Sequence, residues 1–144
     1  MRRFAGLSAA ALIALALAVP AVAGGGTSAS INKWVLKTTN GNETLKPGKT
    51  FSHCSQNHVK EIDAKGTVSG ADKGGSYKAV WRKDGEKIIT FNETWHKKNG
   101  KVKFSSLSNT VDDLPDGKFK VTVKQHGKTL DSATIKLKTT GSCN

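Results

Sequence analysis

The chain has 144 residues, of which 36% are hydrophobic and 24% charged, and its formal net charge is +12 at pH 7. Once an N-terminal segment is set aside, this length allows one domain with a core and excludes two ordinary ones. The lysines are spread along the whole chain. Such a surplus predicts attraction to anionic polymers, although a lysine-rich surface also keeps an exported domain soluble.

Residues 1–23 carry the three parts of a secretory signal peptide. Arg2 and Arg3 precede an apolar run, which ends in Pro20 and the small-residue triplet 21–23. We expect cleavage after this triplet, because the run is alanine-rich and short for a membrane-spanning helix, which needs about 20 strongly apolar residues. The remaining chain is expected to be exported, to be periplasmic or extracellular, and to lack a transmembrane segment.

The exported chain is expected to have two parts. Residues 24–30, GGGTSAS, lack apolar periodicity and predict a flexible lead-in, and residues 31–144 are expected to form one domain. Because Arg2 and Arg3 leave with the signal peptide, the net charge falls from +12 to +10. The expected partners are therefore a protein, an anionic polysaccharide or another envelope component.

Short segments rich in Val, Ile, Thr and aromatic residues lie between turn dipeptides such as Asn-Gly and Asp-Gly. In KFKVTVK, residues 118–124, Phe119, Val121 and Val123 alternate with residues that would face water, the pattern of a half-buried strand. The chain as a whole predicts an all-β, antiparallel two-sheet sandwich of about 7–8 strands. The expected strands are 31–38, 49–55, 58–68, 76–83, 86–95, 101–107, 118–125 and 128–138.

Two runs in the second half of the chain combine a turn with the pattern of a strand. In YKAVWRKDGEKI, residues 77–88, a tryptophan in a central strand is followed by an Asp-Gly turn. In DLPDGKFKVTVKQHGKTLDSATIKLK, residues 113–138, a Pro-x-Gly turn leads into the alternating residues of what would be the last hairpin. These runs resemble immunoglobulin-like modules of exported bacterial proteins. The resemblance implies an immunoglobulin-like sandwich, and a fold-level resemblance carries no function with it.

HCSQNH, residues 53–58, places a thiol beside two imidazoles and leaves two interpretations open. In an exported chain, Cys54 and Cys143 are expected to form a disulfide, which would close a loop of about 90 residues and stabilise the fold by roughly 4–5 kcal/mol. The alternative is a copper or zinc site that uses His53, Cys54 and His58. Since neighbouring strand residues point to opposite faces, we favour the disulfide and expect no cofactor.

WHKKNGKVK, residues 95–103, is the one surface cluster that predicts a binding site. An Asn-Gly hairpin turn would gather its lysines into a cationic tip beside an aromatic platform, which suits a sulfated, phosphorylated or uronic polysaccharide. A single arginine outside the signal peptide argues against sequence-specific reading of nucleic acid. Alternatively, Trp95 is a core residue and the lysines only solvate a hairpin. The candidate binding residues are Trp95, His96, Lys97, Lys98, Lys101 and Lys103.

No set of catalytic residues emerges from the sequence. There is no G-x-S-x-G elbow, no H-E-x-x-H motif and no phosphate-binding glycine loop. We therefore expect a non-enzymatic, exported module that binds a protein or an anionic envelope or extracellular polymer through its loops and its basic hairpin. The alternative function is that of a periplasmic metal-binding protein.

Overall fold

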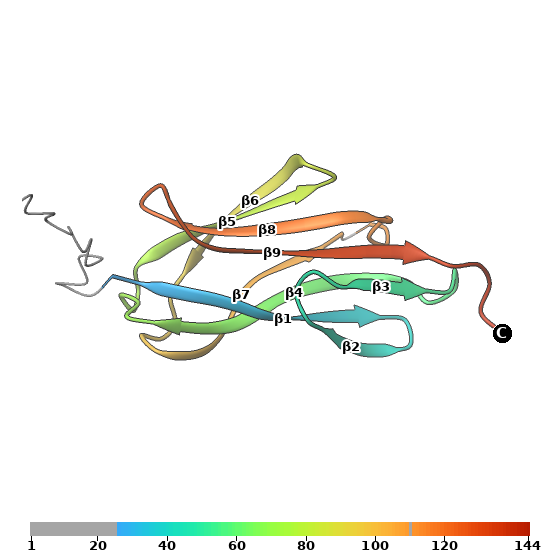
Figure 1. Cartoon of the computed structure of the whole chain (residues 1–144), viewed down its shortest axis with the longest axis horizontal. Helices are drawn as coiled ribbons and strands as arrows, with labels where there is room; N and C mark the ends of the chain where they lie inside the picture. The colour runs from blue at the N-terminus through green and yellow to red at the C-terminus, as the bar shows by residue number, and fades with distance from the viewer. Residues whose placement is uncertain (1–25, 110) are drawn as a thin grey trace, which may run out of the picture.

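The computed structural model describes residues 26–109 and 111–144, which form nine strands (Figure 1). The expected signal peptide and the start of the lead-in lie outside the described residues. No helix long and apolar enough to cross a membrane occurs in the part of the chain that the structure describes. The strands are β1 (Ser28–Thr38), β2 (Gly41–Leu45), β3 (Thr50–His53), β4 (Val59–Ser69), β5 (Ser76–Lys83), β6 (Glu86–Thr94), β7 (Gly100–Ser108), β8 (Gly117–Gln125) and β9 (Lys128–Thr139).

The strands form two sheets that pack face to face. Sheet A has the order β2-β1-β4-β7, and sheet B has the order β3-β9-β8-β5-β6. Figure 1 shows β1, β2 and β4 below and β5, β8 and β9 above. Trp34 of β1 and Trp81 of β5 meet between the layers, with ring centroids 5.9 Å apart, and the indole N–H of Trp34 donates to the carbonyl of Thr134 at 2.9 Å. The predicted all-β, two-sheet sandwich is confirmed.

The alternating pattern of β8 predicts its orientation correctly. Phe119, Val121 and Val123 are each no more than 1% exposed, whereas Lys118 and Lys120 are exposed. Burying three side chains of this size favours folding by several kcal/mol, at roughly 1.5–3 kcal/mol each. This apolar inner side holds β8 in the middle of sheet B and leaves its lysines on the outside.

Three details of the fold differ from the prediction. There are nine strands, because β2, with the sequence GNETL, is polar and exposed and gives no apolar alternation. The sandwich is not wholly antiparallel, since β3 enters sheet B parallel to β9 after the chain leaves sheet A. Residues 28–30, expected in the lead-in, already belong to β1 and pair with β4, although their small side chains carry no periodic signal.

Two tight turns fix the register of sheet B. The β5–β6 hairpin turns at Asp84 and Gly85, with φ of 50° and 88°, and the β8–β9 hairpin turns at His126 and Gly127, with φ of 51° and 75°. Two successive residues with positive φ give the turn whose twist matches that of the strands. These turns therefore decide which side chains of β5 and β6, and which side chains of β8 and β9, stand opposite one another.

Candidate functional site

The segment that follows β3 is held by a disulfide and by the C-terminal tail. Cys54 is bonded to Cys143, 89 residues later, with 4.9 Å between their Cα atoms, so the expected disulfide is confirmed. The amide of Thr140 donates to the carbonyl of His53 at 2.8 Å, and the amide of Cys143 donates to the Gln56 side chain at 2.7 Å. The tail beyond β9 is thus fixed to this end of the sandwich.

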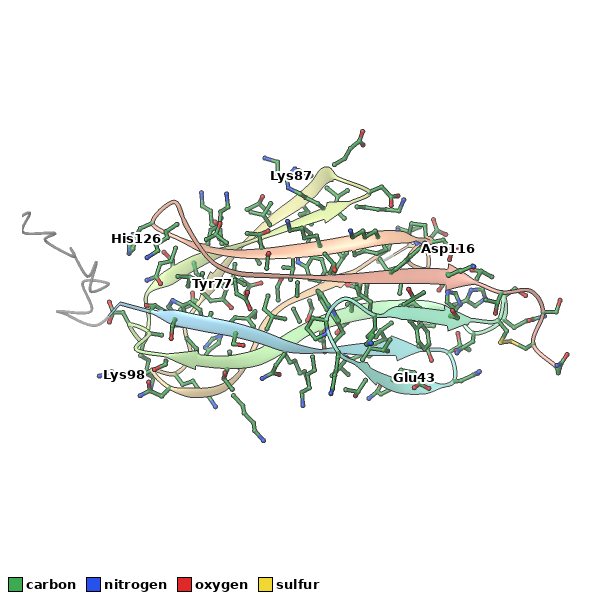
Figure 2. The ribbon with its side chains drawn as sticks, viewed as in Figure 1. Glu43, Tyr77, Lys87, Lys98, Asp116 and His126 are labelled. Carbon is green, nitrogen blue, oxygen red and sulfur yellow. A yellow bond between two sulfur atoms is a disulfide. The ribbon has the colours of Figure 1, made fainter. Side chains whose placement is uncertain are left out.

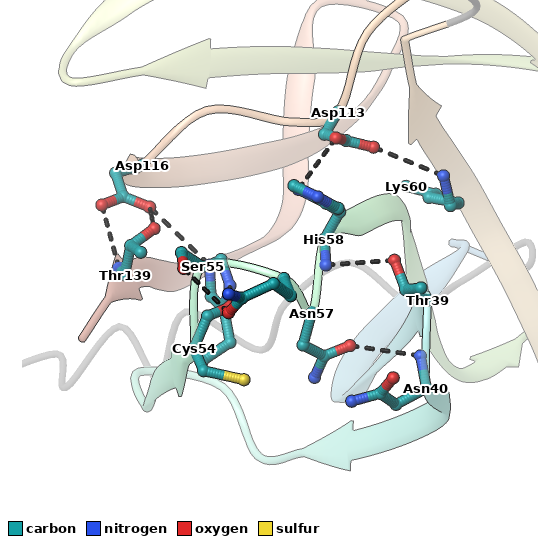
Figure 3. A network of polar contacts seen from close by, with 12 residues as sticks. Thr39, Asn40, Cys54, Ser55, Asn57, His58, Lys60, Asp113, Asp116 and Thr139 are labelled. Carbon is teal, nitrogen blue, oxygen red and sulfur yellow. Dashed lines mark hydrogen bonds and ion pairs between the residues drawn. The ribbon is translucent and has the colours of Figure 1, made fainter. Parts of the chain in front are cut away.

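The two histidines of the same segment have different partners. Nε2 of the buried His53 lies 3.7 Å from a carboxylate oxygen of Asp116, whereas Nδ1 of His58 lies 2.9 Å from Asp113 (Figure 3). The sulfur of Cys54 is engaged in the disulfide. Among the described residues, no three His, Cys, Asp or Glu side chains gather where they could hold a metal ion. The alternative ligand set of His53, Cys54 and His58 is therefore not assembled.

Asp116 braces the same end of the molecule. Its carboxylate accepts hydrogen bonds from the backbone N–H of Thr139 at 2.9 Å and from the Thr139 hydroxyl at 2.8 Å (Figure 3). The backbone hydrogen bond, assisted by the hydroxyl and by the neighbouring His53, lowers the pKa of Asp116 below its ordinary value. These contacts join the start of β8 to the end of β9, and they are structural in character.

The segment 95–103 is not a hairpin. β6 belongs to sheet B and β7 pairs with β4 in sheet A, so the chain between them crosses from one sheet to the other. Trp95 is 2% exposed, and its ring stacks on that of Tyr77 with 3.9 Å between centroids. The expected aromatic platform is therefore absent from the surface. The Asn-Gly dipeptide ordinarily marks a hairpin, but here the buried Trp95 anchors a crossover.

Five of the six predicted binding residues lie around one hollow. This hollow, of about 420 Å³, is lined by Trp95, His96, Lys97, Lys101 and Lys103 among others, whereas Lys98 lines another hollow of about 670 Å³. In Figure 2, Lys98 lies at the end of the sandwich opposite Asp116. The structure therefore brings five of the six residues together and leaves Lys98 apart, and a binding role for them stays a prediction.

Many of the described cations lie together on the outer face of sheet B. Trp81, Val121 and Ile135 are buried in the core, so the residues that alternate with them point outward. The outward positions of the five described strands carry eight cations and no aspartate or glutamate. We call this surface the cationic face. Its cations are Lys78, Arg82, Lys87, Lys118, Lys120, Lys124, Lys136 and Lys138.

The strand register places these cations directly opposite one another. Arg82 of β5 stands between Lys87 of β6 and Lys120 of β8, so three cations form one row across three strands. Lys78 faces Lys124 in the same way, and Lys118 faces Lys136. Figure 2 shows Lys87 near the tip of the β5–β6 hairpin, on the side away from sheet A. Like charges directly opposite in a sheet are destabilising.

None of the eight cations takes part in an ion pair within the described residues. The lysines that do form ion pairs are Lys37 and Lys60 of sheet A, and Lys83, which ends β5 beside the cationic face and is not among its eight cations. The other outward side chains of the cationic face are mainly Ser, Thr and Asn, with the half-buried Val80 and, at the bulge of β6, the exposed Ile88. A shallow hollow of about 390 Å³ lies among Arg82, Lys118 and Lys120. The face therefore combines uncompensated charge with hydroxyl groups that can donate hydrogen bonds.

A carboxylate stands at one end of the cationic face, in the β5–β6 turn. Asp84 accepts hydrogen bonds from the backbone N–H of Lys118 and from Nζ of Lys83, each at 2.9 Å. The hydrogen bond from Lys118, then that from Lys83, lowers the pKa of Asp84, and the charges of Lys83 and Lys136 add to the effect. The hydrogen bonds of Asp84 are thus made to Lys83 and to the backbone of Lys118, and Asp84 forms no ion pair with any of the eight cations.

The sequence predicts which lysines of this face point to water, but it does not predict that they lie together. Alternation places lysines of 118–124 on the water side, and the same reasoning applies to β5 and β9. It does not tell which strands are neighbours, because β8 lies between β5 and β9 and the connection from β5 to β8 is long in sequence. Without the strand order, evenly spread lysines cannot be recognised as one surface.

The chain matches no protein-family model, and it finds no significant match among curated proteins.

Proposed function

We propose that the chain is an exported, non-enzymatic binding module that holds a linear phosphate- or sulfate-bearing polymer against its cationic face. One observation carries this proposal, namely eight cations on one sheet surface that have no carboxylate among them and form no ion pair with the residues that the structure describes. Opposed lysines destabilise a sheet unless anions neutralise them, so a bound polyanion would relieve a repulsion that is built into the register.

Two features support the wider description as an exported, immunoglobulin-like module. Two packed sheets, and a central strand with Trp81 followed by the Asp84-Gly85 turn, fit such a sandwich. The Cys54–Cys143 disulfide favours export, because disulfides persist in oxidising compartments outside the cytosol.

The chemistry of the cationic face favours recognition of charge over recognition of rings. No aromatic side chain stands at an outward position of its described strands, so neither sugar rings nor bases have a platform for stacking. Seven of its eight cations are lysines, which act as point charges without the fixed geometry of the arginine fork. We therefore expect tolerance of polymer sequence and a strong dependence on salt.

A linear polymer suits this face better than a membrane surface does. Proteins that lie on anionic bilayers usually add aromatic or large apolar residues that enter the headgroup region. The cationic face offers no aromatic residue and only the half-buried Val80 in its middle, although the edge strand β6 also exposes Ile88 and Ile89 beside Lys87. Anionic vesicles consequently serve as a competing ligand in the test.

The test measures binding of fluorescently labelled long-chain polyphosphate and of dextran sulfate to the exported form of the chain, over a range of salt concentrations. A face variant replaces four lysines of the cationic face by glutamine. A matched control replaces four exposed lysines of loops and ends, so that both variants lose the same net charge. The face variant changes Lys118, Lys120, Lys124 and Lys136. The control changes Lys46, Lys73, Lys98 and Lys128.

We expect the face variant to bind at least about tenfold more weakly at low salt, and its salt slope to fall by about 1 for each contacting lysine removed. The control should retain most of its affinity. Equal losses in the two variants would overturn the proposal, since binding would then follow net charge and not the face. If the protein bound phosphatidylserine vesicles more tightly than both polymers, the ligand of the cationic face would be a membrane surface and not a polymer.

A further inference from the structure

The outer face of sheet A carries a second, smaller group of opposed lysines. Lys65 of β4 stands directly between Lys33 of β1 and Lys103 of β7, so the three form a row across the sheet. Lys101 lies two residues before Lys103 on the same strand and faces Thr67. We call the four lysines, Lys33, Lys65, Lys101 and Lys103, the sheet A cluster.

Carboxylates are present on this face, but they are occupied by other groups. Glu61 pairs with Lys37 at 2.7 Å, and the pKa of Lys37 is raised by that hydrogen bond and by the charges of Asp63 and Glu61. Asp63 is buried and accepts a hydrogen bond from the hydroxyl of Ser106. No lysine of the cluster forms an ion pair with any described residue. The cluster thus keeps its charge uncompensated.

The sheet A cluster surrounds a hollow that can receive an anionic group. Its four lysines line a shallow space of about 330 Å³, together with Gly66 and Thr67. A side chain at Gly66 would place a Cβ atom 1.8 Å from the carbonyl oxygen of Ser30, so only glycine fits there. Four ammonium groups around an open strip of backbone suit a phosphate or sulfate group that can accept several hydrogen bonds.

The two cationic surfaces point away from each other. They lie on the outer sides of two packed sheets, whose backbones are about 10 Å apart in such sandwiches. Figure 1 shows the layers of sheet A and sheet B with their outer sides facing in opposite directions. One short segment of polymer that lies on sheet B therefore cannot also lie on the sheet A cluster.

We propose that the sheet A cluster is a second binding site for phosphate- or sulfate-bearing polymer, so that one molecule bridges two polymer segments. This inference rests on the proposed function of the cationic face. The site on sheet A is the weaker of the two, because it has four lysines against eight cations and has carboxylates nearby. Linking two sites on one scaffold raises avidity and joins separate chains of polymer.

A structural explanation of the same lysines predicts a different result. β7 is an edge strand of sheet A, and lysines on an edge discourage pairing with other chains. If that were their whole role, their replacement would leave the behaviour of polymer mixtures unchanged, apart from a loss of net charge.

The test separates bridging from binding. Light scattering is recorded while the protein is mixed with long-chain polyphosphate at increasing ratios, and affinity is measured in parallel on immobilised polyphosphate. The cluster variant replaces the four lysines of the sheet A cluster by glutamine. The control is again the variant with glutamine at Lys46, Lys73, Lys98 and Lys128, which has the same net charge.

We expect the wild type and the control to scatter strongly at intermediate ratios, and the cluster variant to lose most of the scattering while its affinity changes less than about threefold. In addition, tripolyphosphate should cause saturable shifts of the amide NMR signals of Gly66 and Thr67 in the wild type. Scattering by the cluster variant that equals the control, or amide signals that do not move, would overturn the second site and leave the proposed function standing. Absence of polymer binding by the wild type would instead refute the proposed function itself.

Discussion

The outer faces of the two sheets use lysine in different ways. On sheet A, Lys37 is paired with Glu61 at 2.7 Å, and the face mixes lysines with two carboxylates. On sheet B, eight cations share a surface without any carboxylate at an outward position of its strands. Both faces arise from the same alternation of apolar and polar residues. Alternation therefore decides which side chains meet water, and the register decides whether their charges are compensated.

The difference also concerns stability. Rows such as Lys87, Arg82 and Lys120 repel one another, at a cost of a few tenths of a kcal/mol to about 1 kcal/mol for each opposed pair. The inner sides of the same strands bury Trp81, Val121 and other core residues completely. The core of sheet B can thus carry a surface that opposes folding, as surfaces retained for binding often do.

The largest effect is expected from the scaffold that both faces share. Replacing Cys54 and Cys143 together by serine should lower the free energy of unfolding by roughly 4–5 kcal/mol, because the 89-residue separation makes loop closure costly. Urea denaturation measures this loss. Polyphosphate binding should be unchanged under conditions in which the variant stays folded. Weaker binding by a folded variant would mean that the disulfide end contributes to the cationic face.

Much of this scaffold could be predicted from the sequence. The alternation in KFKVTVK located β8, and the turn dipeptides placed most strand boundaries within one or two residues. β2 and the start of β1 cannot be predicted in this way, because hydrogen bonds to neighbouring strands hold them and their polar or small side chains give no periodic pattern. The parallel contact of β3 with β9 likewise depends on a crossover, which local patterns do not encode.

The candidate site was harder to predict than the fold. The sequence points to the segment with Trp95 because an aromatic residue and lysines are close together in it, yet Trp95 is 2% exposed and its ring does not lie on the surface. Lys78, Lys120 and Lys136 are far apart in sequence, and only the order of β5, β8 and β9 brings them onto one face. Cations that are brought together by the pairing of distant strands cannot be recognised in any short segment of the sequence.

A medium effect is expected when one cation of each face is reversed. Lys120→Glu would place a carboxylate opposite Arg82, and Lys65→Glu would place one between Lys33 and Lys103. Each change should raise the free energy of unfolding by about 0.2–1 kcal/mol, because a repulsive row becomes an attractive one.

Polymer binding should separate these two reversals. We expect Lys120→Glu to weaken polyphosphate binding severalfold and Lys65→Glu to leave it nearly unchanged, since the first lies on the cationic face. Lys73→Glu, in a loop, is the control for net charge. If Lys120→Glu proved less stable than the wild type, repulsion between the opposed cations would not lower the stability of sheet B. The two faces would then not differ in the energetic cost of their charges.

The smallest effect concerns the carboxylate at the end of the cationic face. The hydrogen bond from the backbone of Lys118, then that from Lys83, holds the pKa of Asp84 below its ordinary value. The stability that Asp84 contributes is therefore complete above about pH 4 and is lost as the pH falls through the lowered pKa. Asp84→Asn should be less stable than the wild type at neutral pH, and urea denaturation should show this difference in the free energy of unfolding disappear in acid.

The Asp84→Asn variant should also bind polyphosphate slightly more tightly than the wild type, whereas Asp72→Asn, in a loop at the other end, should not. Equal gains in both variants would mean that the polymer senses only the net charge of the molecule, and that the distinction between its two faces has no role in binding.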